Sequence, residues 1–325
     1  MGLPVAGVSW TRVLDDTSEA TVSLAGLGRS PACFAAFREA AAWQHEVAIV
    51  RDDAVVWQGP LTGRSANASA ATWTARDLSV WLDRRVLPVD RSYVQVDVAT
   101  IFSDLVADAM SVDDSPNVTV SVEPTGVLAT RRYLAGQHLL AGPELRELAK
   151  AGIDWTVVGR SVIAGGTTVP VSPIVLLQDT HLSAPPSVST DGLAATNRYG
   201  IAGAGGGEGA DPIYAEASDA ASIATYGLLQ DVTREDRVRD VTSAQAAADS
   251  RLVLVADPVV KLDAVRLAAA APVLLSQLVP GALVGCAFAS SAIEVSGVYR
   301  LHTVAVTAAG GNESVTLTLE PVGST

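Results

Sequence analysis

Residues 281–321 read GALVGCAFASSAIEVSGVYRLHTVAVTAAGGNESVTLTLEP, and this stretch decides the expected fold. Apolar and polar residues alternate, the alternation breaks at glycine and asparagine, and then it resumes. A period of two is typical of strands that are buried on one face, and glycine and asparagine are typical of the turns between them. The segment therefore predicts the closing strands of a β-barrel, and nothing in it indicates catalysis.

The β pattern extends upstream, so residues 171–325 predict a barrel domain. Strand-like runs recur at 173–182, 196–205 and 260–270. One helix is expected at 243–255, because Thr242 and Gln245 have the Thr-x-x-Gln spacing of a capping box. Its predicted apolar side consists of Ala244, Ala248, Leu252 and Val255.

Residues 1–90 predict a first, similar β-barrel domain. Runs at 8–14 and 20–27 are expected as strands around an acidic turn, and a hairpin is expected to turn at Asp52-Asp53. Ser30-Pro31 suits the start of a short helix. A further helical turn is predicted where Leu78, Trp81 and Leu82 recur at helical spacing.

Residues 91–170 predict an α+β insert between the two barrels. A helix at 95–110 is expected to be capped by Asp97, with Ile101, Leu105 and Ala109 on its apolar face. Residues 118–124 are expected as a strand. Gly152 is expected to end a second helix, and Gly159-Arg160 to turn a hairpin. The predicted fold class is thus β-rich α+β, with two tube-type β-barrel domains flanking an α+β insert.

Composition excludes several classes of protein. The formal net charge is −13, which argues against a basic nucleic-acid-binding surface. No run of 18 apolar residues occurs, so no membrane insertion is expected. The N-terminus, MGLPVAGVSW, lacks the basic flank and apolar core of a signal peptide. Cys33 and Cys286 both lie among apolar residues, and we interpret them as buried thiols rather than a disulfide.

No combination of residues predicts an active site. The patterns Gly-x-Ser-x-Gly, His-Glu-x-x-His and paired cysteines do not occur. The glycine-rich loop 203–209 lacks the lysine of a phosphate-binding loop, and Asp211-Pro212 follows it where a dinucleotide-binding motif would open a helix. We therefore expect that the chain is not an enzyme, with no catalytic, cofactor-binding or metal-binding residues and no cofactor.

The remaining titratable residues have structural interpretations. The histidines are not spaced as metal ligands, and those in strand-like runs are expected to be half-buried. Adjacent acidic residues point in different directions and are common in turns, so they do not predict a catalytic carboxylate pair. The residues concerned are His45, His138, His181 and His302, and the pairs Asp15-Asp16, Asp52-Asp53 and Asp113-Asp114.

Six phrases of the sequence resemble the tail-hub proteins of tailed bacteriophages, and in particular minor tail proteins of actinobacterial siphophages. VSWTRVLDDTSEATVSL (8–24), AAWQHEVAIVRDDAVVWQGPLTG (41–63) and TWTARDLSVWLDRRVLP (72–88) resemble their opening. LRELAKAGIDWTVVG (145–159) resembles their middle unit of helix and hairpin, and YGLLQDVTREDRVRDVTSAQAAADSRL (226–252) resembles a strand followed by an alanine-rich helix. The sixth phrase, LVPGALVGCAF…VSGVYRLHTVAV…ESVTLTLEP (278–321), resembles their closing barrel strands. The stretch 281–321 would then be the second tube-forming barrel.

The resemblance implies a structural subunit of the tail tip or baseplate in the virion. In that family three copies form a ring, and two barrels from each copy face a six-fold tube. The implied partners are two further copies of the chain, a distal tail or tail tube protein, the tape-measure protein, and a spike or fibre below. DNA would pass through the lumen without specific binding. Since the chain ends at Thr325, we expect that any hydrolase or receptor binder lies on another chain.

One alternative is a receptor-binding minor tail protein that recognises a host cell-wall glycan. Aromatic side chains often form the platform for a sugar, and tryptophans are concentrated in the first 90 residues. Core packing is the preferred interpretation, but a single exposed tryptophan would keep the alternative open. The tryptophans in question are Trp10, Trp43, Trp57, Trp73 and Trp81.

Overall fold

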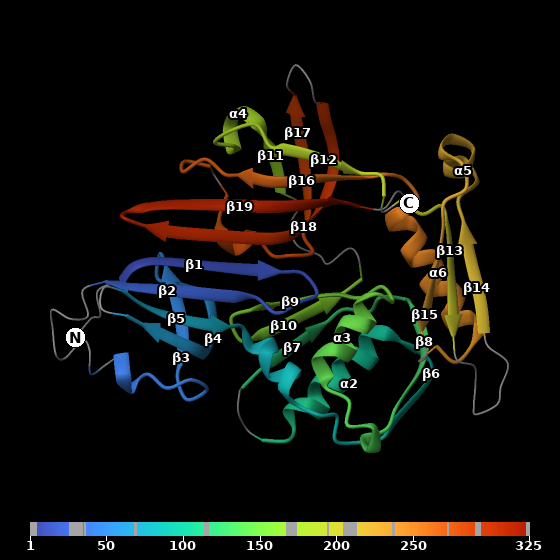
Figure 1. Ribbon diagram of the computed structural model, residues 1–325, viewed down its shortest axis with the longest axis horizontal. Coiled ribbons are helices and arrows are strands. Elements are labelled where there is room, and N and C mark those ends of the chain that lie inside the picture. The colour runs from blue at the N-terminus through green and yellow to red at the C-terminus, as the bar shows by residue number, and fades with distance from the viewer. Residues whose placement is uncertain are drawn as a thin grey trace.

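A computed structural model of the chain describes most of the sequence (Figure 1). The described residues are 5–25, 35, 37–67, 70–113, 117–166, 174–193, 195–203, 213–235, 238–271, 273–289 and 294–322. They form mostly strands with few helices, as the sequence predicts. None of their helices is long and apolar enough to cross a membrane.

The largest element is an 11-stranded sheet built from both ends of the chain. Strand β1 pairs antiparallel with β18, from Gly7 opposite Ala309 to Val13 opposite Thr303. The sheet order is β12-β16-β19-β18-β1-β2-β5-β4-β3, and β17 and β11 branch from β18. The strands are β1 (Val5–Val13), β2 (Glu19–Ala25), β3 (Glu46–Arg51), β4 (Ala54–Ala66), β5 (Ala70–Arg76), β11 (Ile174–Leu177), β12 (Ser187–Asp191), β16 (Val259–Arg266), β17 (Leu283–Ala289), β18 (Glu294–Ala309) and β19 (Asn312–Pro321).

Two predicted barrels therefore appear as parts of one sheet. Among the described residues the strand pairing does not close either half into a barrel. The predicted strands are present except at 178–181, where the run expected at 173–182 continues as a short helix. The Asp52-Asp53 hairpin is confirmed, with positive φ at both turn residues as a type I′ turn requires. Short elements next to this sheet are α4 (Gln178–His181) and the 3₁₀ helix η4 (Leu275–Gln277).

A middle unit lies beside the large sheet and has its own core (Figure 1). Helix α2 begins where the Asp97 carboxylate accepts a hydrogen bond from the Ala99 amide at 2.8 Å, and its predicted apolar face is fully buried. Gly152, at φ +106°, follows helix α3, and Gly159 turns the predicted hairpin. The elements are η2 (Leu78–Arg84), β6 (Arg91–Asp97), α2 (Val98–Met110), β7 (Thr119–Val122), β8 (Leu128–Tyr133), η3 (Ala135–Gln137), α3 (Ala141–Ala149), β9 (Asp154–Val158) and β10 (Ser161–Gly165).

A smaller third unit packs one helix on a three-stranded sheet. Helix α6 covers β13 and β14, and its buried side is made of small residues, chiefly alanines. In Figure 1 this unit stands at one end of the molecule, next to β6 and β8. Its elements are β13 (Arg198–Gly203), β14 (Ile213–Ser218), α5 (Ala220–Tyr226), β15 (Gln230–Glu235) and α6 (Val241–Val255). The domain limits at residues 90 and 170 stay a prediction.

The predicted cap of α6 is wrong. The helix begins two residues earlier than expected, and its N-cap is Asp240, whose carboxylate accepts from the Ser243 amide at 2.8 Å. An ionised carboxylate is a stronger acceptor for the free amides of a first turn than a threonine hydroxyl. Gln245 instead donates to the Glu216 carbonyl at 3.1 Å, which ties the helix to β14. The predicted cap Ser30-Pro31 and the loop at 204–209 lie outside the described residues.

Arg12 connects the two ends of the chain inside the shared core. It lies on β1 between Trp10 and Leu14, and all three side chains are buried. Its guanidinium donates to the Leu275 and Leu278 carbonyls at 3.2 and 3.3 Å, and also to the Val56 carbonyl. Burial lowers the Arg12 pKa to about 10, so the group stays charged at neutral pH. One side chain thus satisfies three buried carbonyls from distant segments.

The first prediction concerns Arg12. Replacing it by alanine leaves these carbonyls without donors, so the free energy of unfolding should fall by at least about 3 kcal/mol. Urea unfolding monitored by circular dichroism measures the loss. Arg76→Ala is the matched control, because its ion pair with Glu19 is exposed and contributes under about 1 kcal/mol. Equal losses for the two variants would contradict the role given to Arg12.

Candidate functional site

The residues examined in the sequence for chemistry do not converge on one site. His45 is exposed just before β3, so the expectation that it is half-buried in a strand is wrong, and its Nδ1 accepts from the Ala41 amide at 3.1 Å. His302 lies on β18 with its Nδ1 at 2.9 Å from the Thr303 hydroxyl. Within the described part of the chain, no three His, Cys, Asp or Glu residues group as metal ligands. Cys286 is a buried free thiol whose pKa is raised to about 12 by burial, while Cys33 lies outside the described residues.

The tryptophans are buried or half-buried. Trp10 and Trp57 belong to the core of the large sheet. Trp73 stacks on Phe37 with ring centroids 6.0 Å apart. Trp43 lies edge-on to Trp81 at 4.9 Å, and the Arg84 guanidinium lies over its ring at 5.8 Å. None of the tryptophans is exposed, which favours core packing over a sugar platform.

The pair Asp52-Asp53 consists of turn residues, whereas Asp15 has a further role, and Asp114 of the third pair lies outside the described residues. Asp52 and Asp53 are exposed in their hairpin. Asp15, at φ +60°, turns β1 toward the middle unit, where its Oδ1 accepts from the Trp155 amide at 2.8 Å and its own amide donates to the Trp155 carbonyl at 2.8 Å. This two-way link joins the large sheet to β9. Adjacency in sequence gave no sign of it.

A charged cluster surrounds this link. Asp154 is buried, and the Arg300 Nη1 lies 2.8 Å from each of its carboxylate oxygens. Burial, followed by the nearby charge of Asp154, raises the pKa of Asp15 to about 8. Burial also raises the pKa of Asp154, against the opposing effect of Arg300. The junction between β1, β9 and β18 therefore holds more acid than base in a site with little solvent.

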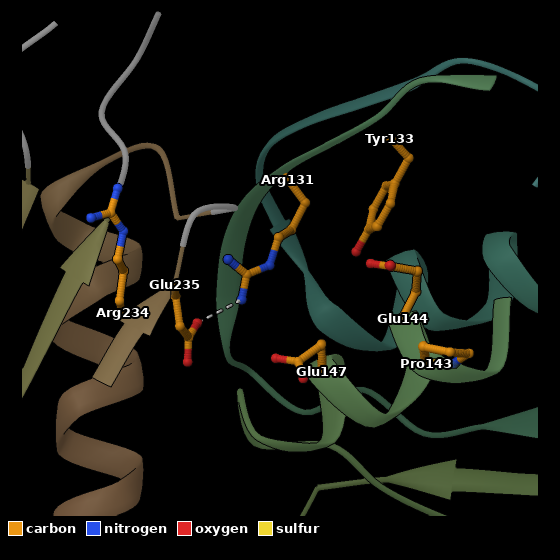
Figure 2. A pocket seen from close by; sticks show the side chains of 7 residues that line it. All are labelled: Arg131, Tyr133, Pro143, Glu144, Glu147, Arg234 and Glu235. Carbon is orange, nitrogen blue, oxygen red and sulfur yellow. Dashed lines mark ion pairs between the residues drawn. The ribbon is translucent and has the colours of Figure 1, made fainter. Parts of the chain in front are cut away.

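A second junction contains a cavity of about 290 Å³ between the middle and third units (Figure 2). Arg131 and Tyr133 come from β8, and Arg234 and Glu235 from β15 on the opposite side. In Figure 2 the Tyr133 hydroxyl points toward the Glu144 carboxylate of α3. The lining residues are Arg131, Tyr133, Pro143, Glu144, Glu147, Arg234 and Glu235.

Glu235 lies between two buried guanidinium groups. Its Oε2 is 3.8 Å from the Arg131 Nη2, and its Oε1 contacts the Arg251 guanidinium of α6. Arg251 also donates to the Tyr199 hydroxyl at 3.2 Å. The Arg131 Nη1 is buried without a hydrogen-bond partner. The third unit is thus attached to the middle unit through charged groups, which hold a fixed geometry only when each charge is compensated.

Three further polar contacts support the same junction. The Thr130 amide of β8 donates to the Ser243 hydroxyl at 3.0 Å, and that hydroxyl donates to Asp240 at 2.8 Å. The Gln95 side chain donates to Asp240 at 3.4 Å. Hydrogen bonding to Ser243 lowers the pKa of Asp240 despite its partial burial, which favours the charged form of the cap. These contacts hold the start of α6, and with it the third unit, against β6 and β8.

Glu235 supplies the second prediction. Glu235→Gln leaves two buried guanidinium groups without a charged partner and should lower the free energy of unfolding by about 3 kcal/mol. The measurement is the urea midpoint. Glu147→Gln, in the same cavity, is the matched control, because Glu147 pairs with the exposed Lys150 and should lose under about 1 kcal/mol. If the two glutamines cost the same, Glu235 does not hold the junction.

The sequence comparisons found no match. No protein-family model matches the chain. No curated protein is similar to it in sequence.

The three-dimensional structure does resemble solved proteins. The tail protein from Neisseria meningitidis MC58 is 11% identical, with a TM-score of 0.66 over 98% of this chain and 93% of that one. The 43 kDa tail protein of prophage MuSo2 from Shewanella oneidensis is 11% identical, with a TM-score of 0.64 over 98% and 94%.

A third similar structure belongs to a secretion system. The c3393 protein of E. coli is 12% identical, with a TM-score of 0.56 over 99% of this chain and 74% of that one. It is a component of the type VI secretion system and is structurally similar to the T4 bacteriophage tail proteins gp27 and gp5. At these identities the likeness establishes the fold, and it confirms the resemblance seen in the sequence: this chain has the fold of bacteriophage tail proteins.

Proposed function

We propose that the chain is a structural subunit of a phage tail tip or baseplate, in which three copies form a hub ring. The observation that carries the proposal is the fold, which matches tail proteins over nearly the full length of both chains. The phrases at 8–24, 41–63 and 281–321 that resemble phage hub proteins lie on the strands of the shared sheet. Sequence and fold thus support the same class of protein.

The shared sheet suits a ring subunit. Because β1 pairs with β18, the two predicted tube halves belong to one continuous sheet and are not connected by a linker alone. Each half also contains one long strand that serves two sets of partners, β4 for β3 and β5, and β18 for β17 and β1. Two similar halves in each of three copies would present six repeats to a six-fold tail tube.

An exposed apolar face supports a role inside an assembly. Val175 of β11, Gly285 of β17 and Val298 of β18 lie in register across three strands. Val175 and Val298 are 56% and 54% exposed, and Leu177 beside them is 44% exposed. Apolar groups gathered on one face are typical of surfaces that another chain covers. The mean hydropathy of +0.31 is high for a chain in which we expect no membrane insertion, and it points the same way.

Charge supports passage of DNA without binding. The net charge of −13 disfavours adhesion of a polyanion to the subunit. The further partners of the proposal are a distal tail or tail tube protein on one face, a spike or fibre on the other, and the tape-measure protein in the lumen. Its place is the tail tip of the virion. The actinobacterial siphophage origin remains part of the same proposal.

Ring formation is the third prediction. Light scattering of the purified protein should give about 100 kDa, three times the 33.4 kDa of one chain. Negative-stain averages of that species should have three-fold symmetry, a central hole and six similar outer densities. A monomer that binds host cell-wall glycan would contradict the proposal and favour the receptor-binding alternative. A six-fold ring would contradict the three-copy arrangement.

A further inference from the structure

The third unit is inserted into a hairpin of the large sheet. Strand β12 pairs antiparallel with β16, and the last residue of β12, Asp191, lies opposite Val259, the first residue of β16. The elements from β13 to α6 all lie between these two residues in the chain. The unit is therefore attached to the sheet by two short neighbouring segments, 192–196 and 256–258, which we call the neck.

Hydrogen bonds close the unit next to the neck. Asn197 is fully buried, its side-chain amide donates to the Gly227 carbonyl at 2.7 Å, and its Oδ1 accepts from the Leu229 amide at 2.8 Å. The Thr196 amide donates to the Val255 carbonyl at 2.7 Å, which joins the two ends of the unit. Because α6 also covers an apolar core on β13 and β14, the base and the core of the unit are made of its own residues.

The contacts between the third unit and the middle unit are of a different kind. Those described above are polar, and they join Thr130 to Ser243, Gln95 to Asp240 and Arg131 to Glu235. Among the described residues, the apolar cores of the two units have no residue in common. Domains that meet without a large apolar interface are expected to move relative to each other.

The docked position leaves the charge of Arg131 incompletely compensated. Arg131 is 5% exposed, its Nη2 lies 3.8 Å from the Glu235 carboxylate, and its Nη1 has no hydrogen-bond partner. Glu235 is shared with Arg251, which belongs to the third unit. Separation of the two units would return Arg131 to water, while Glu235 would keep a charged partner. The hydration of Arg131 therefore opposes the polar contacts that favour docking.

We propose that the third unit is a hinged domain, which turns as one body about the neck and docks reversibly on strands β6 and β8 of the middle unit. The Leu193 side chain is fully exposed and Asp257 is exposed, so the backbone of the neck can turn without disturbing a packed core. Undocking opens the cavity of about 290 Å³ between the two units, while the base at Asn197 and the core under α6 stay intact.

Amide hydrogen exchange, followed by NMR, separates turning of the unit from its unfolding. The Thr130 amide of β8 reports docking, because its acceptor is the Ser243 hydroxyl of α6. The Ala248 amide lies inside α6 and reports opening of the unit itself. After correction for intrinsic rates, the opening constant of Thr130 should exceed that of Ala248 by at least about 100-fold. Equal constants would overturn the hinge, because the unit would then open only by unfolding.

Substitutions at Gln95 test whether exchange of the Thr130 amide follows docking. The Gln95 side chain donates to Asp240 at 3.4 Å and to the Thr130 hydroxyl at 3.4 Å. Gln95→Met is the neutral reference, because it loses both contacts. Relative to it, Gln95→Glu places a like charge opposite Asp240 and should raise the Thr130 opening constant about two- to fivefold, while Gln95→Lys adds an ion pair and should lower it by a similar factor.

The positive φ of Gln95, +52°, costs the same in the docked and undocked positions, so it does not affect this comparison. The Ala248 opening constant should be the same in all three variants. A Thr130 constant that responds to neither charge would overturn the hinge, because exchange would then arise from local motion of β8, and so would an Ala248 constant that changes with Thr130. Each of these failures leaves the hub proposal as it stands, because that proposal rests on the fold.

Discussion

The pairing of β1 with β18 is the constraint on which the rest of the structure depends. It joins residues 7–13 to residues 303–309, which are separated by nearly the whole chain. Without it the sheet divides into an N-terminal group and a C-terminal group, and the core that mixes Trp10 and Trp57 with Leu301 and Leu317 does not form. Arg12 then connects the two groups of strands by hydrogen bonds inside this core. Long-range closure of this kind costs loop entropy before any contact compensates for it.

Much of the local structure could be predicted from sequence, because its signals are local. Asp97 sits directly before an apolar face of period 3.6, Gly159 sits between two alternating runs, and Asp52-Asp53 has the composition of a tight turn. The α6 cap was missed because two candidate caps, Asp240 and Thr242, lie two residues apart, and the charged one is the better acceptor. The pairing of β1 with β18 has no local signature, and alternation alone does not say which strand pairs with which.

The junctions were harder to predict than the cores. The buried position of Arg12 could have been inferred from the sequence, because it lies on the inward side of a strand between Trp10 and Leu14. A charged residue there requires buried hydrogen-bond acceptors. The link made by Asp15 could not be inferred from the sequence, because its partner is a backbone amide 140 residues away. Glu235 and Arg251 are ordinary surface residues by composition. Apolar cores hold each unit together, while the contacts between units are made of charges whose partners only the folded chain identifies.

Strand β18 changes neighbours in its middle. Residues up to Arg300 pair with β17, and residues from Thr303 pair with β1 on the same side. Between them His302 is the extra residue in the pairing with β19, where the register shifts, and its carbonyl accepts from the Leu14 amide at 2.9 Å. This extra residue places Leu301 and Val304, three positions apart, on the same buried face of the sheet, opposite Leu319 and Leu317. One inserted residue therefore sets which side chains of β18 face the core after it has left β17 and met β1, so a single irregularity adjusts the strand to both halves of the sheet.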